Sequence, residues 1–259
     1  MINDLAIHRL GKLRSSKIIW VFAGVCAFLS LPTLLPAILF SKAVSAEVAG
    51  RSAAINYFMF INFVGHIAAM IMGITAWRQD YRDGTMLTFA ARPIARIELL
   101  IGKLIGSTYG LLTYLGIVVV SYGLVHLIFF RFSVPVVAPL YLLQIFMAWL
   151  STFALGLLFS NFGNPVMATF LAVMYWFLSL LGKAFQQFPV AMLQSAGDML
   201  KYISIDNDQT YSLEEILKSD LPSLSPILQG IGYYFLWAVL LIAISIVLFN
   251  KREFIGKRS

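Results

Sequence analysis

Residues 55–76, INYFMFINFVGHIAAMIMGITA, are followed by the polar stretch 77–85, WRQDYRDGT, and a second long apolar run begins at residue 99. The first run contains no Asp, Glu, Lys or Arg, and its length suits the about 20 helical residues that cross a hydrocarbon core of about 30 Å. The pattern therefore predicts two membrane-spanning helices that are joined by a charged segment.

The rest of the chain repeats this pattern. Of its 259 residues, 60% are hydrophobic and 12% are charged, and the mean hydropathy is +0.84, which lies outside the range of soluble globular proteins. Backbone N–H and C=O groups in lipid must bond within their own segment, and continuous apolar runs achieve this as helices. We therefore expect one all-α membrane domain over residues 1–259. The six expected spans are residues 18–40, 55–76, 99–130, 140–159, 166–182 and 231–249.

Basic residues indicate which ends of these spans face the cytoplasm, because Lys and Arg are retained on that side. Placing both termini in the cytoplasm puts 13 of the 19 basic residues inside, near the two termini and in the segment 77–98 between the second and third spans. The formal net charge of +7 then follows from topology, and no nucleic-acid partner is expected.

Two segments outside the spans have amphipathic patterns. Residues 1–17 carry apolar residues at three- and four-residue spacing opposite Arg9, Lys12 and Arg14, which predicts a helix in the cytoplasmic membrane interface. The expected external loop, residues 183–229, mixes apolar and acidic residues, and we expect it to hold short helices that lid the outer end of the bundle.

Few residues in the spans have obvious chemistry. Cys26 is the only cysteine, so neither an intrachain disulfide nor a metal site is expected. His66 and His126 are the ionisable side chains within the spans; packing against a neighbouring helix and a copper or proton-relay role are the two interpretations. The third span carries small residues at four-residue spacing, which favour close helix packing. These residues are Gly102, Gly106 and Gly110.

One enzymatic interpretation concerns the charged segment. Asp80-x-x-Asp83-Gly84 is similar to the opening of the signature of integral-membrane CDP-alcohol phosphotransferases. That signature needs an Ala-Arg pair soon after the glycine and two further aspartates, whereas Ala91-Arg92 comes too late and no carboxylate follows before Glu98. If the segment has no enzymatic role, Asp80 and Asp83 are juxtamembrane charges that Arg78 and Arg82 offset.

The same segment resembles the permease subunits of type-two ABC transporters. Members of that family carry an acidic residue, a Gly-Thr pair four positions later, Pro-x-x-Arg, and Gly-Lys at the start of the next span. The corresponding residues here are Asp80, Gly84-Thr85, Pro93 to Arg96, and Gly102-Lys103. Asp80 stands where Glu is usual and Ala95 where Ser is common.

The resemblance implies a subunit that couples to a separate cytoplasmic ATPase. The residues implied in coupling are Arg78, Asp80, Arg82, Asp83, Gly84 and Thr85, while Pro93, Arg96 and Lys103 would fix the exit of the segment and anchor the third span at the headgroups. The chain has no phosphate-binding loop of its own, because Gly102-Lys103 lacks the upstream glycine and the following hydroxyl. It is therefore not expected to be an enzyme or to hold a cofactor, and ATP and Mg would bind the partner.

A second permease copy or homologue, the lipid bilayer and a bacterial inner or plasma membrane location are also implied by the resemblance. Two functions remain open: export of a substrate, and mechanical transmission to an extracytoplasmic partner without moving a substrate. Polar residues along a continuous path would favour export, and a sealed interior would favour transmission. The candidates for such a path are Thr33, Ser41, Asn56, Asn62, Tyr175 and Ser179.

Overall fold

The computed structural model describes residues 2–15, 20–21, 24–25, 28, 46–82, 96–129, 138–162, 164–205 and 224–251. Within these ranges the chain is almost entirely helical and contains no strand. The helices are α1 (Ile2–Ser15), α3 (Ala46–Arg82), α5 (Arg96–Phe129), α6 (Ala138–Ser160), α7 (Pro165–Gln186), α8 (Ala191–Ile203) and α10 (Leu224–Lys251).

Five of these helices contain stretches long and apolar enough to cross a membrane. The stretches are Tyr57–Ala76, Leu100–Ser121, Pro139–Ser160, Val166–Gln186 and Leu224–Phe249. They coincide with the expected second to sixth spans, which confirms an α-helical multi-span architecture for the described part of the chain. The expected first span, residues 18–40, lies mostly outside the described residues, so the total of six stays a prediction.

The last two spans are longer than the sequence pattern predicted. α7 begins where the side chain of Asn164 accepts a hydrogen bond from the Val166 N–H, and it continues to Gln186 instead of ending at residue 182. α10 begins at Leu224 instead of residue 231, and Pro226 fits in its first turn because a backbone N–H there needs no helical acceptor. The expected loop 183–229 is therefore much shorter than predicted.

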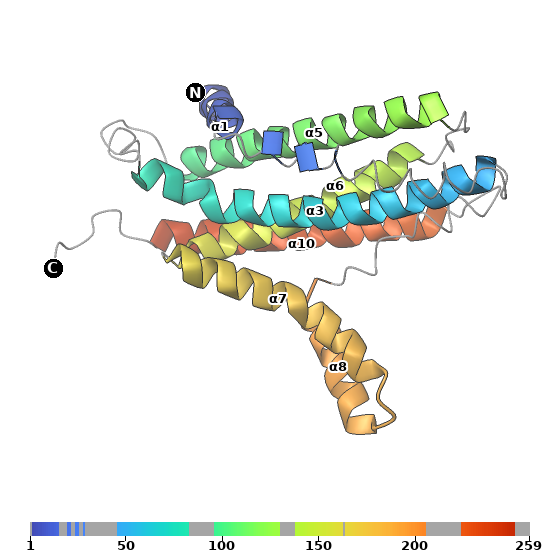
Figure 1. The fold of residues 1–259 in the computed structure, drawn as a ribbon. Coiled ribbons are helices and arrows are strands. Elements are labelled where there is room, and N and C mark those ends of the chain that lie inside the picture. Colours follow the sequence, from blue (N-terminus) through green and yellow to red (C-terminus); the bar gives the residue numbers. More distant parts are fainter. Residues whose placement is uncertain are drawn as a thin grey trace.

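α6 lies at the centre of the bundle, with its main contacts to α3 on one side and to α10 on the other. Trp149 and Phe153 of α6 are fully buried and belong to one core cluster with Tyr114 of α5 and Ile61 of α3. Figure 1 shows that the axes of α3, α5, α6 and α10 are roughly aligned and that α3 and α10 end on the side where α5 begins. The alternating directions of successive helices agree with a chain that crosses the membrane repeatedly.

Small residues set the closest approach, which is between α3 and α6. A methyl group at Gly65 would lie 2.0 Å from a ring carbon of Trp149, and one at Gly73 would lie 2.3 Å from the carbonyl oxygen of Phe153. A methyl group at Gly156 would in turn lie 2.6 Å from the carbonyl oxygen of Met70. Glycine is therefore required at all three positions for this packing.

α1 and the α7–α8 pair stand apart from the bundle direction. Figure 1 shows α1 nearly end-on, across the direction of α5, against which it packs. Ala6 of α1 is buried, whereas Ile7 is exposed. α8 packs on α7, and the two project sideways from the bundle (Figure 1). The expectation that a helix of this region lids the outer end of the bundle is therefore wrong for α8, because its packing surface is on α7.

Candidate functional site

The predicted coupling segment, residues 77–98, includes the last residues of α3 and the first residues of α5. α3 ends at Arg82 and α5 begins at Arg96. The backbone at Arg78, Asp80 and Arg82 continues the α3 helix, so the first part of the expected segment is a helical extension of the second span. Asp83, Gly84, Thr85 and Pro93 lie outside the described residues.

Lys103 links the two helices that flank this segment. Its side chain is only 4% exposed, and its Nζ donates a hydrogen bond of 3.1 Å to the carbonyl oxygen of Ala76, which is itself fully buried. The residues are 27 positions apart in the sequence, so this is a contact between α5 and α3. The ammonium group of Lys103 is thus bonded inside the protein at the last residue of the span Tyr57–Ala76, and its predicted role as a headgroup anchor stays a prediction.

The three glycines of α5 that the sequence singled out, Gly102, Gly106 and Gly110, are all buried. The main contacts of α5 are with α1, and its contacts with α3 and α6 are smaller. The close α3–α6 approach at Gly65 and Gly73 was not anticipated. A signal for it exists in the sequence, because Gly65, Ala69 and Gly73 are small residues at four-residue spacing, as in the α5 pattern.

Two polar contacts join α3 and α6 inside the bundle. His66 Nδ1 lies 2.7 Å from Thr152 Oγ1, and both side chains are buried. One helical turn away, the indole Nε1–H of Trp149 donates to the Asn62 side-chain and backbone oxygens at 3.1 and 3.2 Å. These bonds satisfy groups that would otherwise be costly in an apolar interior. The contact of His66 with Thr152 agrees with the first of its two interpretations, packing against a neighbouring helix.

No metal centre accompanies this histidine in the described part of the chain, which contains no group of three His, Cys, Asp or Glu side chains placed to hold an ion. Two residues that were candidates for a polar path, Asn62 and Tyr175, use their polar atoms in internal bonds. Apart from these polar contacts, aromatic and aliphatic side chains fill the described interior between α3 and α6.

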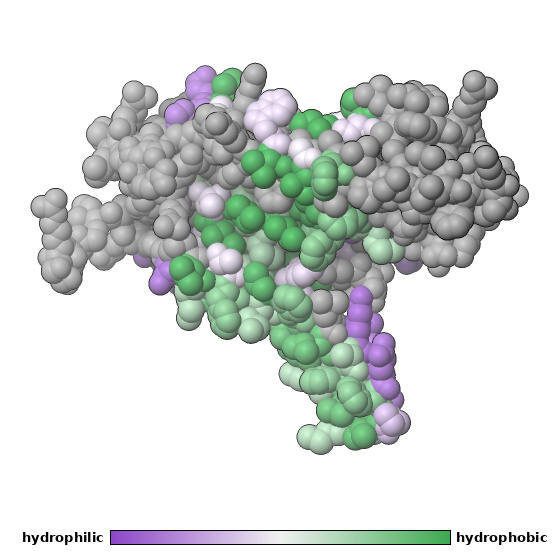
Figure 2. Space-filling view, viewed as in Figure 1, coloured by the Kyte–Doolittle hydropathy of each residue, from purple (hydrophilic) through white to green (hydrophobic). Residues whose placement is uncertain are grey.

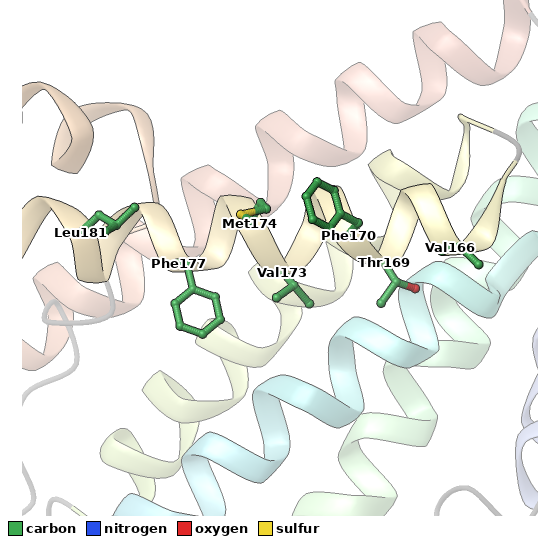
Figure 3. A pocket seen from close by; sticks show the side chains of 7 residues that line it. All are labelled: Val166, Thr169, Phe170, Val173, Met174, Phe177 and Leu181. Carbon is green, nitrogen blue, oxygen red and sulfur yellow. The ribbon is translucent and has the colours of Figure 1, made fainter.

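One recess of the described surface is an apolar groove along α7. Its volume is about 760 Å³, and its lining is entirely aliphatic or aromatic apart from Thr169. Figure 3 shows these side chains spaced along one side of the helix. They are Val166, Thr169, Phe170, Val173, Met174, Phe177 and Leu181. A groove of this kind can accept acyl chains or side chains of another span, but it has no charged group to fix a polar ligand.

Comparison with known proteins assigns the chain to a family. No curated protein matches it. The family model described as "ABC-2 family transporter protein" matches residues 27–254, which include all the helices described above from α3 onward and nearly the whole chain. This agrees with the multi-span helical fold and with the charged segment between the first two described spans. The chain is thus a membrane-embedded transport subunit, not itself catalytic, and belongs to the ABC-2 transporter family.

Proposed function

We infer that this chain is the permease subunit of an ATP-driven exporter and that a separate cytoplasmic ATPase acts on it through residues 77–98. The observation that carries this inference is the Lys103–Ala76 bond. It joins the two helices on either side of the segment, so that a force applied to the segment moves α3 and α5 together. Because α3 is also packed closely on α6, the displacement would pass into the centre of the bundle.

The working complex contains two permease chains and two ATPases. ATP and Mg bind the ATPases, and their closure rocks the two permeases so that a path between them opens alternately to either side. Both termini and residues 77–98 face the cytoplasm of a bacterial cell, because most of the basic residues lie there. This arrangement is supported by the family match and by the charge distribution.

The first test is to purify the tagged chain gently from its native host and to identify any soluble protein that accompanies it. A stoichiometric ATPase with a phosphate-binding loop is the expected result. Repeated recovery of the chain alone, or with a protein that cannot bind ATP, would contradict the inference.

A second test addresses the coupling segment in the reconstituted complex. The double substitution Asp80→Ala with Gly84→Ala should lower ATPase activity in the presence of the permease while the chain still inserts and remains folded. The matched control is Asp198→Ala with Gly116→Ala, an acidic residue and a glycine that lie away from the segment. Normal coupled activity in the first variant would show that force enters elsewhere.

Mechanical transmission is the second candidate. One of the candidate path residues, Asn62, accepts a hydrogen bond from Trp149 inside the chain, which favours a sealed interior at this position. A transmitter would hydrolyse ATP only when its extracytoplasmic partner is present, and its proteoliposomes would export nothing. ATP-dependent depletion of a compound from vesicles would instead establish export.

A further inference from the structure

The end of α8 enters the bundle although the body of the helix does not. α8 packs on α7, and the α7–α8 hairpin, residues 165–205, projects sideways (Figure 1). The two residues that follow α8, Ser204 and Ile205, are nevertheless 0% and 5% exposed. Ile205 belongs to a buried cluster with Leu155 of α6 and Leu241 of α10. These two residues, which we call the link, thus connect the hairpin to the α6–α10 pair.

Two tyrosine hydroxyl groups bond to the chain at the link, one from each of two spans. Tyr175 of α7 donates to the Ile203 carbonyl oxygen at 2.6 Å. Tyr233 of α10 donates to the Ser204 carbonyl oxygen at 3.3 Å. Carbonyl groups at the end of a helix lack helical donors and need such partners. Two consecutive peptide groups are therefore bonded to two different spans.

α8 is fixed on α7 by close backbone contact. A methyl group at Gly197 would lie 2.7 Å from the Gly182 carbonyl oxygen, and a methyl group at Gly182 would lie 3.1 Å from that of Gly197. A glycine at each position lets the two backbones touch. A displacement of the link therefore moves α7 as well as α8.

Apart from the link, α7 and α10 have little connection. The main contacts of α7 are with α8, and its contacts with α6 and α3 are smaller. The main contacts of α10 are with α6, and α7 and α10 are in little direct contact. Figure 1 shows α7 diverging from α10 toward the end of α7 that carries α8. The link is therefore placed where it can hold together two spans whose axes separate.

The rest of the hairpin offers contacts that are less directional. Figure 2 shows hydrophobic residues over most of the hairpin in this view, with hydrophilic residues along one edge. Apolar surfaces can slide a short distance along one another at little cost, whereas a hydrogen bond weakens steeply when its angle or length changes. The two tyrosine bonds therefore fix the end of α8 more tightly than apolar packing alone.

We propose that the link transmits motion between spans: Tyr175 and Tyr233 hold α7 to α10 through it, so that a displacement of the α6–α10 pair is passed to α7 and its apolar groove. The route from the ATPase rests on the proposed function, in which motion enters at α3 and reaches α6. From α6 it passes to α10 by direct packing and then to α7 through the link. The two tyrosines are positioning residues, because their hydroxyl groups bond to the chain itself.

The experiment measures distances between two nitroxide labels in the full-length chain, reconstituted without nucleotide in phosphatidylcholine–phosphatidylglycerol nanodiscs. In a Cys26→Ala chain, Ala184→Cys on α7 and Leu228→Cys on α10 place labels at exposed positions of the two linked spans. A second pair, Leu143→Cys on α6 with the same α10 label, reports on two helices that pack directly on each other. Pulsed electron paramagnetic resonance gives the distribution of distances for each pair.

Tyr175→Phe and Tyr233→Phe test the link, because each removes one hydroxyl group and keeps the ring. Loss of a hydrogen bond of about 1 kcal/mol changes an equilibrium about fivefold, so each variant should raise the population at longer α7–α10 distances by up to about this factor. Because the two bonds act in series, the rise in the double variant should not exceed the sum of the two single rises. The matched control is Tyr202→Phe, at an 86% exposed tyrosine of α8, which should change nothing.

Unchanged α7–α10 distances in both single variants would overturn the proposal. A rise in the double variant equal to the product of the single effects would show that the two bonds act separately. Broadening of the α6–α10 distribution in either variant would show a general loosening of the fold. Each of these two results would also overturn the proposal.

The consequence for coupling is measured in the reconstituted complex with the partner ATPase. Tyr175→Phe and Tyr233→Phe should lower the ATPase response to the permease several-fold, and Tyr202→Phe should not. Altered distances with a full ATPase response would show that the link holds the spans without transmitting motion, which contradicts the proposal. If the chain captures no ATPase, the proposed function fails, while the nucleotide-free distances still decide whether the link joins α7 to α10.

Discussion

At the scale of single residues, the packing of the bundle depends on glycines, which leave room for large side chains of the neighbouring helix. Gly65 accommodates the indole ring of Trp149, whose Nε1–H then reaches the Asn62 oxygens. A close backbone approach and a polar contact are therefore produced by the same pair of helices at the same level. Such contacts stabilise helix pairs in lipid, where burial of apolar surface alone gives little preference for one partner.

Replacing Gly65 with alanine tests this packing. The new methyl group would overlap the Trp149 ring, so α3 and α6 must separate, and we expect a loss of about 1–3 kcal/mol of stability. The measurement is thermal unfolding of the purified chain in detergent, followed by Trp fluorescence. Gly116→Ala is the control, because nothing lies within 4 Å of its added methyl group. An unchanged melting temperature for Gly65→Ala would show that the two helices are not in this contact.

At the scale of elements, the pairing of α3 with α5 is the contact most closely connected to function. It includes the hydrogen bond from Lys103 to the Ala76 carbonyl group, in addition to other contacts between these helices. Burying an ammonium group is costly unless it is bonded, so the position of Lys103 constrains both helices.

Lys103→Met should weaken this connection while keeping a side chain of similar length. We expect a loss of about 1–3 kcal/mol of stability, typical of a hydrogen bond to a charged group, together with a lower ATPase response in the complex. Lys251→Met, at an exposed lysine near the end of α10, is the matched control and should change neither quantity. Full coupling in the Lys103 variant would show that α3 and α5 respond to the ATPase without this bond.

At the scale of the whole molecule, the helices alternate in direction, so that α3, α6 and α10 end where α5 and α7 begin (Figure 1). The end of α3 at Arg82, the start of α5 at Arg96 and the basic end of α10 are thus at the same end of the bundle. This arrangement agrees with a chain whose cytoplasmic side carries both the ATPase contact and the C-terminus.

Reporter fusions test this topology directly. A periplasmic alkaline phosphatase domain fused after Gln187 should be active, because that residue follows α7 on the outer side, whereas a fusion after Lys251 should be inactive. A cytoplasmic reporter at the same two sites should give the opposite pattern. Activity of the phosphatase at Lys251 but not at Gln187 would reverse the assigned orientation.

The expected second to sixth spans were recoverable from the sequence because membrane crossing requires a continuous apolar run, which hydropathy reports directly. Their ends were less accurate. α7 and α10 extend beyond the apolar runs, since a helix that packs on a neighbour can continue through polar residues such as Lys183 and Gln229. The α8 helix was expected only as one of several short amphipathic segments, without a position.

The charged segment between the second and third spans was identified from its polarity, and its role in coupling and its cytoplasmic location stay predictions. Three features could not be predicted from the sequence: the partner of Lys103, the pairing of His66 with Thr152, and the direction of the α7–α8 hairpin. Each of these depends on helix rotation, and a span that is apolar on all sides gives no periodic signal from which rotation can be read.

The sequence by itself thus determined that the chain crosses the membrane several times, where the described spans lie and which segment is charged, because the cost of polar groups in lipid depends only on local composition. The tertiary structure decided which faces meet: Gly65 with Trp149, Lys103 with Ala76, and α8 with α7 and not across the bundle. These pairings follow from shape and hydrogen bonding between residues far apart in the sequence, 27 positions for Lys103 and Ala76 and 87 for the Trp149–Asn62 bond beside Gly65. In an apolar solvent such contacts distinguish one packing of the same helices from another.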